Sequence, residues 1–475
     1  MIAPTIGCSD VQRLRRAPRT QPDPCPFPIL PRHARDALVL GVALLAFACA
    51  PAPEPAAPTP PPSIVIYLTD TLRADRLGAY GCDCGTSPRF DAFAREAVVF
   101  DDAWAVAPWT RPALGSLFTG IYPPAAEGFD RGLPKELATL AEILKDAGYR
   151  TGAVVANHLV NERTGFSQGF DDWNGGDPEL YGISAAEVVR RGLRFVEAAQ
   201  PAPFFLFLHT LEPHEPYEPS AEAYRLFGAG EVRRPSKPLL KRARVDHRTR
   251  RYLEGLYAGE IWDNDRAFGA LLDGLRTQRA LDSSFVIFTA DHGEELWDHG
   301  ARGHGRRLYQ ELLRVPLAVR LPGGSRGGAR EASPFGQIDL LPTLAGVLGL
   351  RAPATDGHDL SPRWLGRQAT PPAVELLSQT RFAKADKQAI RHGPWKLIVS
   401  RDASASRSKR GSVELYDLVK DPRETRNLAD TRTDIVARLE SRLVSRGLAR
   451  SADPPAAREL PEEDREALRA LGYIE

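Results

Sequence analysis

Residues 63–70 read SIVIYLTD and residues 284–295 read SFVIFTADHGEE. Each stretch is a short run of mostly β-branched and aromatic residues, and an aspartate follows almost at once. Runs of this length are typical of strands that are buried on both faces, as in a parallel sheet covered by helices. The two stretches therefore predict central strands of an α/β fold.

Other segments continue this alternation of strands and helices. Buried strands are expected at 63–68, 151–156, 203–208, 284–289 and 315–321, and helices at 137–147, 261–275 and 338–350. After residue 370 the pattern changes to strands at 387–391, 395–399 and 413–418, followed by a polar helix at 434–446. The sequence thus predicts a large, mostly parallel sheet flanked by helices, with a smaller C-terminal subdomain.

The composition divides the chain into four parts. These are a leader at 1–50, a proline-rich linker at 51–62, a catalytic domain at 63–370 and a C-terminal subdomain at 371–475. In the leader, positive residues precede an apolar run that ends in LAFAC, with Cys49 last. This ending resembles a bacterial lipoprotein box, in which Cys49 is lipidated; the alternatives are a plain signal peptide or a short anchor. We expect export to the periplasm or cell surface, with membrane contact only through this N-terminal anchor.

The overall charge excludes one class of partner. The chain has 62 Lys and Arg against 61 Asp and Glu, so no global positive field attracts nucleic acid. A basic stretch at 233–251 has two interpretations: it lines an entrance for an anionic polymer, or it is a solvated loop. The oligomeric state is not indicated.

Polar residues follow two of the predicted strands directly. Asp70 follows the first strand, and Asp291 and His292 follow the strand at 284–289. The carboxyl ends of parallel strands meet at one edge of a sheet, so these side chains can converge. Two carboxylates and an imidazole suit one divalent cation; the histidine favours zinc or manganese, with calcium and magnesium as alternatives. An aspartate after a strand is also a common helix cap.

A threonine begins the next chemically informative segment, PWTRPALGSLFTG at 108–120. Pro112 suits the first turn of a helix, which places Thr110 at the N-cap. Free backbone N–H groups at a helix start attract an anionic ester. If a cation contacts the same hydroxyl, Thr110 becomes a nucleophile; otherwise it is a plain cap.

Six segments together resemble the sulfatase family of the alkaline phosphatase superfamily. They read, in this order, IVIYLTDTLRADRLGAYG, the Thr-x-Pro helix ending in LFTG, GYRTGAVVANHL, LHTLEPHEPY, FTADHGEELWDHGARGHG and ELYDLVKDPRETRNLA. The resemblance covers nearly everything from Ser63 onward. It implies a large α/β domain around a mixed sheet, a small C-terminal four-stranded sheet with a helix, and hydrolysis of sulfate or phosphate esters.

The resemblance also assigns roles to individual residues. It implies that Asp70, Asp291 and His292 are metal ligands and that Thr110 is the metal-bound nucleophile. His214 and His304 would stabilise the transferred anion, and the resemblance adds further candidates for contact with the substrate: His158, Arg73 and His299.

The sequence departs from the family pattern at the nucleophile. Sulfatases carry Cys or Ser in Cys-x-Pro-Ser-Arg, which is oxidised to formylglycine, whereas this chain has Thr110 and lacks the motif's arginine. Metal-bound threonine resembles the phosphoryl-transfer branches, so phosphate esters are mildly favoured. Three hypotheses follow: an ester hydrolase, an exported phosphoethanolamine- or phosphoglycerol-type transferase, and a non-catalytic glycan-binding relative. The expected partner is an anionic ester, on an envelope or extracellular glycan or lipid.

Two further features are open at this stage. Cys82 and Cys84 are two residues apart, so a bond between them would close a strained ring, and we expect unbonded loop residues. Trp395 and Lys396 either reach the mouth of the pocket or belong to core and surface.

Overall fold

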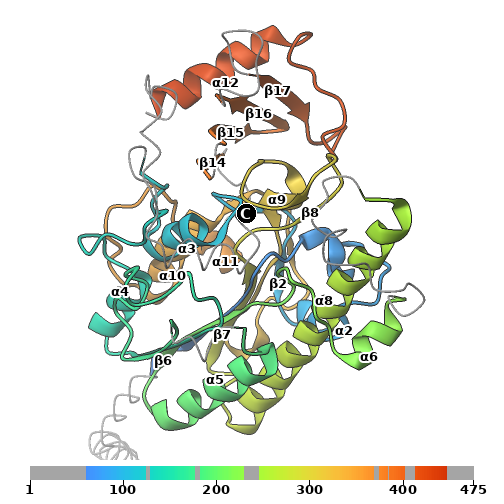
Figure 1. The fold of residues 1–475 in the computed structure, drawn as a ribbon. Helices are drawn as coiled ribbons and strands as arrows, with labels where there is room; N and C mark the ends of the chain where they lie inside the picture. Colours follow the sequence, from blue (N-terminus) through green and yellow to red (C-terminus); the bar gives the residue numbers. More distant parts are fainter. Residues whose placement is uncertain are drawn as a thin grey trace, which may run out of the picture. The chain divides into compact units, whose positions relative to one another are not determined.

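The computed structural model describes residues 60–124, 129–176, 182–228, 245–367, 374–382, 385–401 and 412–446 (Figure 1). These residues belong to one compact unit, Pro60–Glu475. The expected leader and most of the linker and of the basic stretch at 233–251 lie outside the described residues. Within the described ranges, no helix is both long and apolar enough to cross a membrane.

The centre of the fold is an eight-stranded mixed sheet. In order along the sheet, its strands are β12 (Arg330–Glu331), β2 (Val98–Phe100), β11 (Leu317–Arg320), β7 (Ser284–Ala290), β1 (Ser63–Thr69), β6 (Phe204–Thr210), β4 (Arg150–Val155) and β5 (Asp172–Asn174). β1 pairs in parallel with both β6 and β7, whereas β11 runs antiparallel to β7. Every residue of β1, β6 and β7 is buried, as expected of strands covered on both faces.

Two groups of helices flank this sheet (Figure 1). In one group, α8 (His247–Thr277) packs against α2 (Pro88–Ala94), α5 (Ala185–Ala199) and α6 (Ala221–Leu226). The other group contains α3 (Thr110–Thr119), α4 (Leu140–Asp146), α10 (Leu340–Leu348) and α11 (Ser361–Trp364). Further short elements are β3 (Ala103–Trp104), β8 (Glu295–Leu296), β9 (Arg302–Gly303), α9 (Gln310–Leu313), β10 (Arg314–Val315) and β13 (Phe335–Gly336). Strands β10, β3 and β13 form one small sheet in that order, and β8 pairs with β9.

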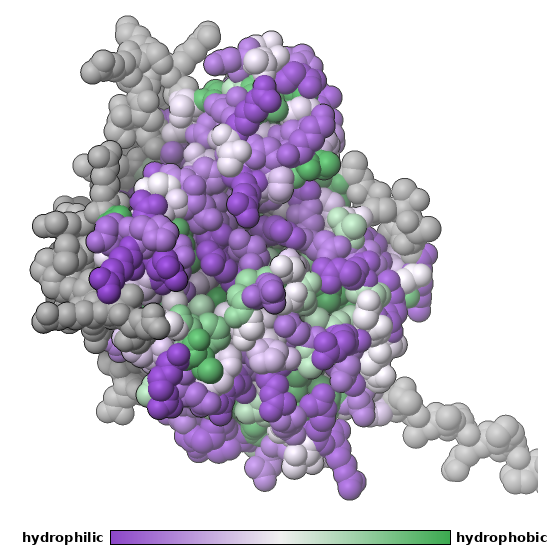
Figure 2. Space-filling model, turned by 90° about the vertical axis from the view of Figure 1, so that its right-hand side faces the viewer, coloured by the Kyte–Doolittle hydropathy of each residue, from purple (hydrophilic) through white to green (hydrophobic). Residues whose placement is uncertain are grey.

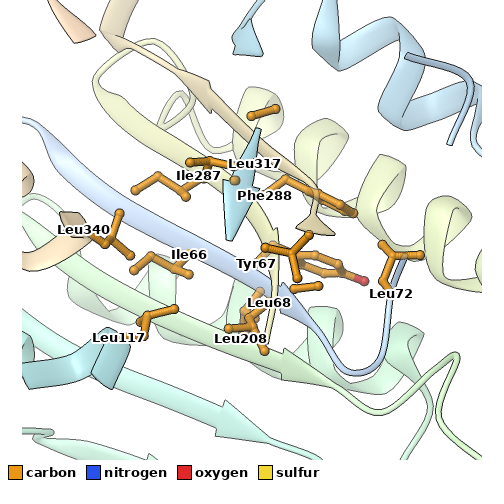
Figure 3. Close-up of a cluster of buried hydrophobic side chains, with 14 of the residues drawn as sticks. Ile66, Tyr67, Leu68, Leu72, Leu117, Leu208, Ile287, Phe288, Leu317 and Leu340 are labelled. Carbon is orange, nitrogen blue, oxygen red and sulfur yellow. The ribbon is translucent and has the colours of Figure 1, made fainter. Parts of the chain in front are cut away.

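Alternating side chains of β1 fill the core on both faces of the sheet. Figure 3 shows Ile66 with Leu117 of α3 and Leu340 of α10 on one side of the strand. On the other side Tyr67 lies beside Phe288, and its ring centre is 5.1 Å from that of Phe268 in α8. This two-sided burial fixes the register of β1 and therefore the position of the residues that follow it.

The C-terminal part forms an antiparallel sheet of four strands covered by one helix (Figure 1). Its elements are β14 (Glu375–Thr380), β15 (Lys387–His392), β16 (Trp395–Ser400), β17 (Val413–Asp417) and α12 (Thr433–Ser445). The family resemblance implied this sheet, and the structure confirms it. The sequence pattern alone missed β14, whose Gln379 backbone N–H donates to the carbonyl of Val106 in the main body at 2.9 Å.

Three expectations about local structure are corrected. The strand expected at 315–321 is split into β10 and β11 at Pro316, which has no N–H to donate to a ladder. The helix expected at 261–275 begins fourteen residues earlier, at His247, where the Asp246 carboxylate accepts a hydrogen bond from the Thr249 N–H. Thr110 is the first residue of α3 rather than its cap, which is Trp109.

The expectation for Cys82 and Cys84 is also wrong, because the structure joins them by a disulfide. Their Cα atoms are 5.3 Å apart, within the usual range for a bridged pair, so the loop itself brings them together. The Cys84 sulfur lies 3.3 Å from the carbonyl oxygen of Arg76, which ties this loop to the segment that follows β1.

The face of the molecule in Figure 2 is mostly hydrophilic, with small apolar patches between the charged side chains. Among the described residues, the large exposed apolar side chains are those of Leu226, Val419 and Val444, which lie on different elements. The described surface therefore favours polar and charged contacts.

Candidate active site

Three adjacent strands of the central sheet each place one acidic or imidazole side chain at the same point. Asp70 follows β1, Asp291 follows β7, and His209 is the penultimate residue of β6. One ligand atom from each residue lies within 4.8 Å of the other two, and all three side chains are fully buried. The order β7-β1-β6 in the sheet produces this convergence.

His209 is the member of this group that the sequence analysis missed. The expected strand at 203–208 ends immediately before it, and the same strand-end argument that selected Asp70 would have selected His209. In the structure, its Nε2 lies 3.3 Å from Oδ2 of Asp70. His209 is therefore a candidate ligand from the strand on the other side of β1.

Thr110 and His292 adjoin the same carboxylates. The Thr110 hydroxyl hydrogen-bonds the Asp291 carboxylate. Nε2 of His292 lies 3.4 Å from Oδ2 of Asp291 and 3.8 Å from Oδ1 of Asp70. The structure thus brings together all four residues that the sequence proposed as metal ligands, and adds His209.

The electrostatics of these side chains fit a divalent cation. Burial and the facing charge of Asp70 raise the pKa of Asp291 well above its usual range. Burial also opposes ionisation of Asp70, but the histidines around it, above all His214, outweigh that effect and lower its pKa. Oδ1 of Asp70 and Oδ2 of Asp291 are buried and accept no hydrogen bond from any described residue. Two buried carboxylates with unused oxygens and a nearby imidazole match the donor set of a divalent metal ion.

Two more histidines, His214 and His304, adjoin this group through His292. The ring of His304 has its centre 4.7 Å from that of His292 and 5.0 Å from that of His214. Burial lowers the pKa of His292 to about 3 and that of His304 to about 4, and it lowers the pKa of His214 as well. These three imidazoles are consequently neutral at physiological pH when no substrate anion lies beside them.

Glu294 contacts one ring nitrogen of His304 and orients that ring. Its Oε1 lies 3.0 Å from Nδ1 of His304, and its Oε2 accepts a hydrogen bond from the Tyr217 hydroxyl at 3.3 Å. Burial raises the pKa of Glu294 to about 7. A buried carboxyl with this pKa can hold or release a proton beside His304 near neutral pH.

The other three substrate-contact candidates are placed differently. Arg73 is 3% exposed and is paired with two carboxylates, those of Asp75 at 2.8 Å and Asp298 at 2.7 Å. His299 contacts residues outside the ligand cluster: its Nδ1 lies 2.6 Å from Oε1 of Glu311, and its ring stacks on Tyr309 with the ring centres 3.7 Å apart. Both residues therefore support the loop after β7 rather than the cluster itself.

His158 lies in a loop that contacts the cluster through its neighbour. The side-chain amide of Asn157 donates to Oδ2 of Asp70 at 2.8 Å. On the other side of His158, the Leu159 carbonyl accepts a hydrogen bond from the fully buried Arg111 at 2.9 Å. Arg111 directly follows Thr110, so this loop bridges the start of α3 and the Asp70 carboxylate.

Gln337 is a further supporting residue that the sequence analysis did not identify. Its amide nitrogen donates to the backbone carbonyls of Ala290 at 2.9 Å and Asp291 at 2.6 Å. Its amide oxygen accepts a hydrogen bond from the Val106 N–H at 3.2 Å. Gln337 thus joins the end of β7 to the segment that leads into Thr110.

Comparisons with known proteins identify the family and the fold of this chain. The model of the family described as Sulfatase matches residues 62–350. An ulvan-active sulfatase from Formosa agariphila is 28% identical over 404 residues, which cover 77% of each chain. Among solved structures, the phosphonate monoester hydrolase of Agrobacterium radiobacter aligns with a TM-score of 0.67 at 21% identity, covering 82% of this chain and 95% of that one. A protein solved in complex with its substrate D-glucosamine-2-N,6-O-disulfate aligns with a TM-score of 0.68 at 18% identity, covering 84% of this chain and 100% of that one.

Proposed function

Because the chain belongs to the sulfatase family, we propose that it is a metal-dependent hydrolase of sulfate or phosphate esters whose nucleophile is Thr110. The observation that carries the proposal is the hydrogen bond between the Thr110 hydroxyl and Asp291, one of the carboxylates in the candidate metal cluster. Membership of this family of enzymes removes the third hypothesis, a non-catalytic glycan-binding protein.

The candidate ligands are Asp70, Asp291, His292 and His209, with the Thr110 hydroxyl beside them. When bound, a divalent ion would supply Lewis acidity, which lowers the pKa of a hydroxyl in contact with it and offsets the charge of the ester. The histidine nitrogens favour zinc or manganese as the ion, with calcium and magnesium as alternatives.

The chain's own residues supply the remaining chemistry. Asp291 holds the Thr110 oxygen at the start of α3, where backbone N–H groups and the positive end of the helix favour an anionic ester. His214 and His304 form a pair on the far side of that ester and stabilise its oxygens. When His304 gives a proton from Nε2 to the leaving oxygen, protonated Glu294 replaces it at Nδ1 of the same ring.

The threonine favours phosphate over sulfate esters. A threonine cannot be oxidised to formylglycine. Attack of its oxygen on the ester breaks the bond to the alcohol oxygen, releases the alcohol and leaves a phospho- or sulfo-threonine, which water must then hydrolyse. A phosphonate monoester hydrolase shares this fold, which supports the phosphate assignment. The relatives that act on ulvan and on a disulfated glucosamine support an extracellular or envelope glycan as the carrier of the ester.

We also propose that the protein is exported. The Cys82–Cys84 disulfide supports an oxidising compartment, where such bonds persist. Cell fractionation of the wild type and of Cys49→Ser tests the lipidated form: the wild type should follow the membrane and the variant the soluble fraction. Identical fractionation of the two would remove Cys49 as the anchor.

The test of the activity compares Thr110→Ala with a matched variant in the same helix, Thr119→Ala. The purified proteins are assayed on p-nitrophenyl sulfate, p-nitrophenyl phosphate and bis(p-nitrophenyl) phosphate, with bound metal measured in parallel. We expect phosphate-ester turnover that falls at least about 1,000-fold in Thr110→Ala and stays near wild type in Thr119→Ala. Mass spectrometry of the quenched wild type should find the modification on Thr110.

The outcomes separate the alternatives. Full activity in Thr110→Ala would remove the threonine mechanism, and preference for the sulfate ester would reverse the choice of substrate. Turnover that depends on an added sugar or glycerol acceptor, with the phosphoryl-alcohol group found on that acceptor, would identify the transferase.

A further inference from the structure

Arg302 lies between the histidine pair and the surface. It belongs to β9, two residues before His304, and its Nη2 forms an ion pair of 2.9 Å with Oε1 of Glu215. Glu215 in turn directly follows His214. The charged pair therefore adjoins both histidines, and the positive charge of Arg302 opposes the rise in the pKa of Glu294 that burial causes.

Of the two terminal nitrogens of the Arg302 guanidinium, Nη2 has a partner among the described residues and Nη1 has none. Nη1 is also buried. A buried donor on a charged group is unfavourable without an acceptor, so this arrangement favours a ligand that supplies one. The planar, forked guanidinium of Arg302 suits the oxygens of a carboxylate, sulfate or phosphate group.

The exposed fractions of the side chains indicate which part of a substrate meets Arg302. Asp70, Asp291 and Thr110 have no exposed surface. The side chain of His304 is 5% exposed, that of Arg302 is 17% exposed and that of Glu215 is 32% exposed. Exposure thus increases from the candidate metal cluster through the histidines to the Arg302–Glu215 pair. We therefore expect an ester at Thr110 to extend its leaving alcohol toward this more exposed end.

We propose that Arg302 binds a second oxyanion, carried by the alcohol part of the ester, and so selects substrates that are anionic at two places. This inference rests on the proposed ester hydrolysis. Glu215 fixes one arm of the guanidinium, and the second anion accepts hydrogen bonds from the other arm at Nη1. A neutral alcohol leaves Nη1 without an acceptor and gains nothing from Arg302.

The experiment uses two aryl esters of the same shape, 3-carboxyphenyl and 3-carbamoylphenyl phosphate, with p-nitrophenyl phosphate as the parent substrate. 3-Sulfophenyl phosphate is assayed as a second substrate with an anionic substituent. For the wild type we expect kcat/KM for the carboxylate ester to exceed that for the amide by about 10- to 100-fold, mostly through KM, as for one hydrogen bond to a charged group. In Arg302→Gln this ratio should fall to about 1, while turnover of the parent ester persists.

Two control variants complete the design. Arg302→Lys keeps the positive charge but loses the forked donor geometry, so its carboxylate-to-amide ratio of kcat/KM should lie between those of Arg302→Gln and the wild type. Arg266→Gln changes a surface arginine paired with Glu222 at 2.8 Å, and it should keep the full ratio.

Failure of this inference is distinguishable from failure of the proposed function. A wild type that turns over p-nitrophenyl phosphate but treats the carboxylate and amide esters alike overturns the role of Arg302 alone. The same holds if Arg302→Gln keeps the wild-type ratio. If Arg302→Gln does not fold, the wild-type ratio by itself decides. Inactivity of the metal-loaded wild type on every ester, with or without an acceptor, overturns the hydrolase instead.

Discussion

Replacement of Lys396 by Met is the sharpest test of the buried ion pair within the C-terminal subdomain, at the point where its sheet meets the main body. The Lys396 ammonium and the Glu424 carboxylate lie 2.7 Å apart, and neither side chain has exposed surface. Burial lowers the pKa of Lys396 and raises that of Glu424, and the attraction between the two charges opposes both shifts. Lys396 also lies over the ring of Trp104 at 5.0 Å, in a strand of the main body.

The expected cost follows from the charge that stays behind. Methionine fills nearly the same volume as lysine, so packing changes little, but Glu424 is left buried without a cation. Removal of one partner of a buried pair costs about 3–5 kcal/mol. The matched control is Arg266→Met at the surface pair with Glu222, where the ions are 2.8 Å apart and more than half exposed, and where about 0–1 kcal/mol is expected.

The assay is the free energy of unfolding from urea titrations, followed by fluorescence and circular dichroism. The double variant Lys396→Met with Glu424→Gln removes both charges and keeps an amide oxygen for the Gln310 N–H that Glu424 now accepts from. It should recover to within about 1–2 kcal/mol of the wild type. A loss in Lys396→Met no larger than that in Arg266→Met, or no recovery in the double variant, would refute the reasoning.

Three more predictions concern the site and its supports. Asp291→Asn should release most of the bound divalent metal, measured after dialysis by plasma mass spectrometry, whereas Thr110→Ala should retain it; equal metal content in both would contradict the ligand assignment. Gln337→Met breaks the link between the end of β7 and the segment before Thr110, so kcat should fall about tenfold with KM less affected; an unchanged kcat would exclude a positioning role. Burial opposes protonation of His299, but the Glu311 carboxylate outweighs that effect and raises the pKa of His299 from 6.5 to about 8. The ion pair therefore stabilises the folded protein fully below the pKa of the unfolded chain, and this stabilisation is lost as the pH rises through the pKa of the folded state. His299→Gln should accordingly lower the melting temperature more at about pH 6 than at about pH 9, and an equal loss at both would show that the ion pair is not the cause.

The central sheet was predictable from the sequence because its strands are apolar on both faces. In β1 and β7 nearly every residue packs against a helix, so the sequence shows an unbroken apolar run. The same runs end at Asp70 and Asp291, which made the candidate site visible. Parallel pairing then brings the two strand ends together without any further information in the sequence.

Elements that depend on distant contacts were harder to predict. β14 is positioned by hydrogen bonds to the main body, among them one from the Ser378 hydroxyl to the Ala105 carbonyl at 2.8 Å. Its own sequence, ELLSQT, contains one β-branched residue and no aromatic one, so it has little strand propensity. The first half of α8 carries many charges and two glycines, Gly255 and Gly259, which lower helix propensity. Packing of buried residues such as Tyr257 against the sheet outweighs this.

The alternatives for Trp395 and Lys396 are decided in the same way. Lys396 is core, because a buried partner and an aromatic ring from elsewhere in the chain surround it. Trp395 is partly buried, with the Arg432 guanidinium over its ring at 5.0 Å. Neither partner could be read from the sequence near these residues, since both lie on other elements.

The origin of the candidate ligands in three neighbouring strands links metal affinity to folding. Asp70, His209 and Asp291 are far apart along the chain and meet only when β6, β1 and β7 have paired. The unfolded chain therefore holds no preformed site, and an ion that binds only the folded form stabilises it by about 2.7 kcal/mol at a hundredfold excess over its dissociation constant. Such an ion would link the three central strands of the sheet. A chelator would therefore lower the melting temperature even of a catalytically inactive variant such as Thr110→Ala.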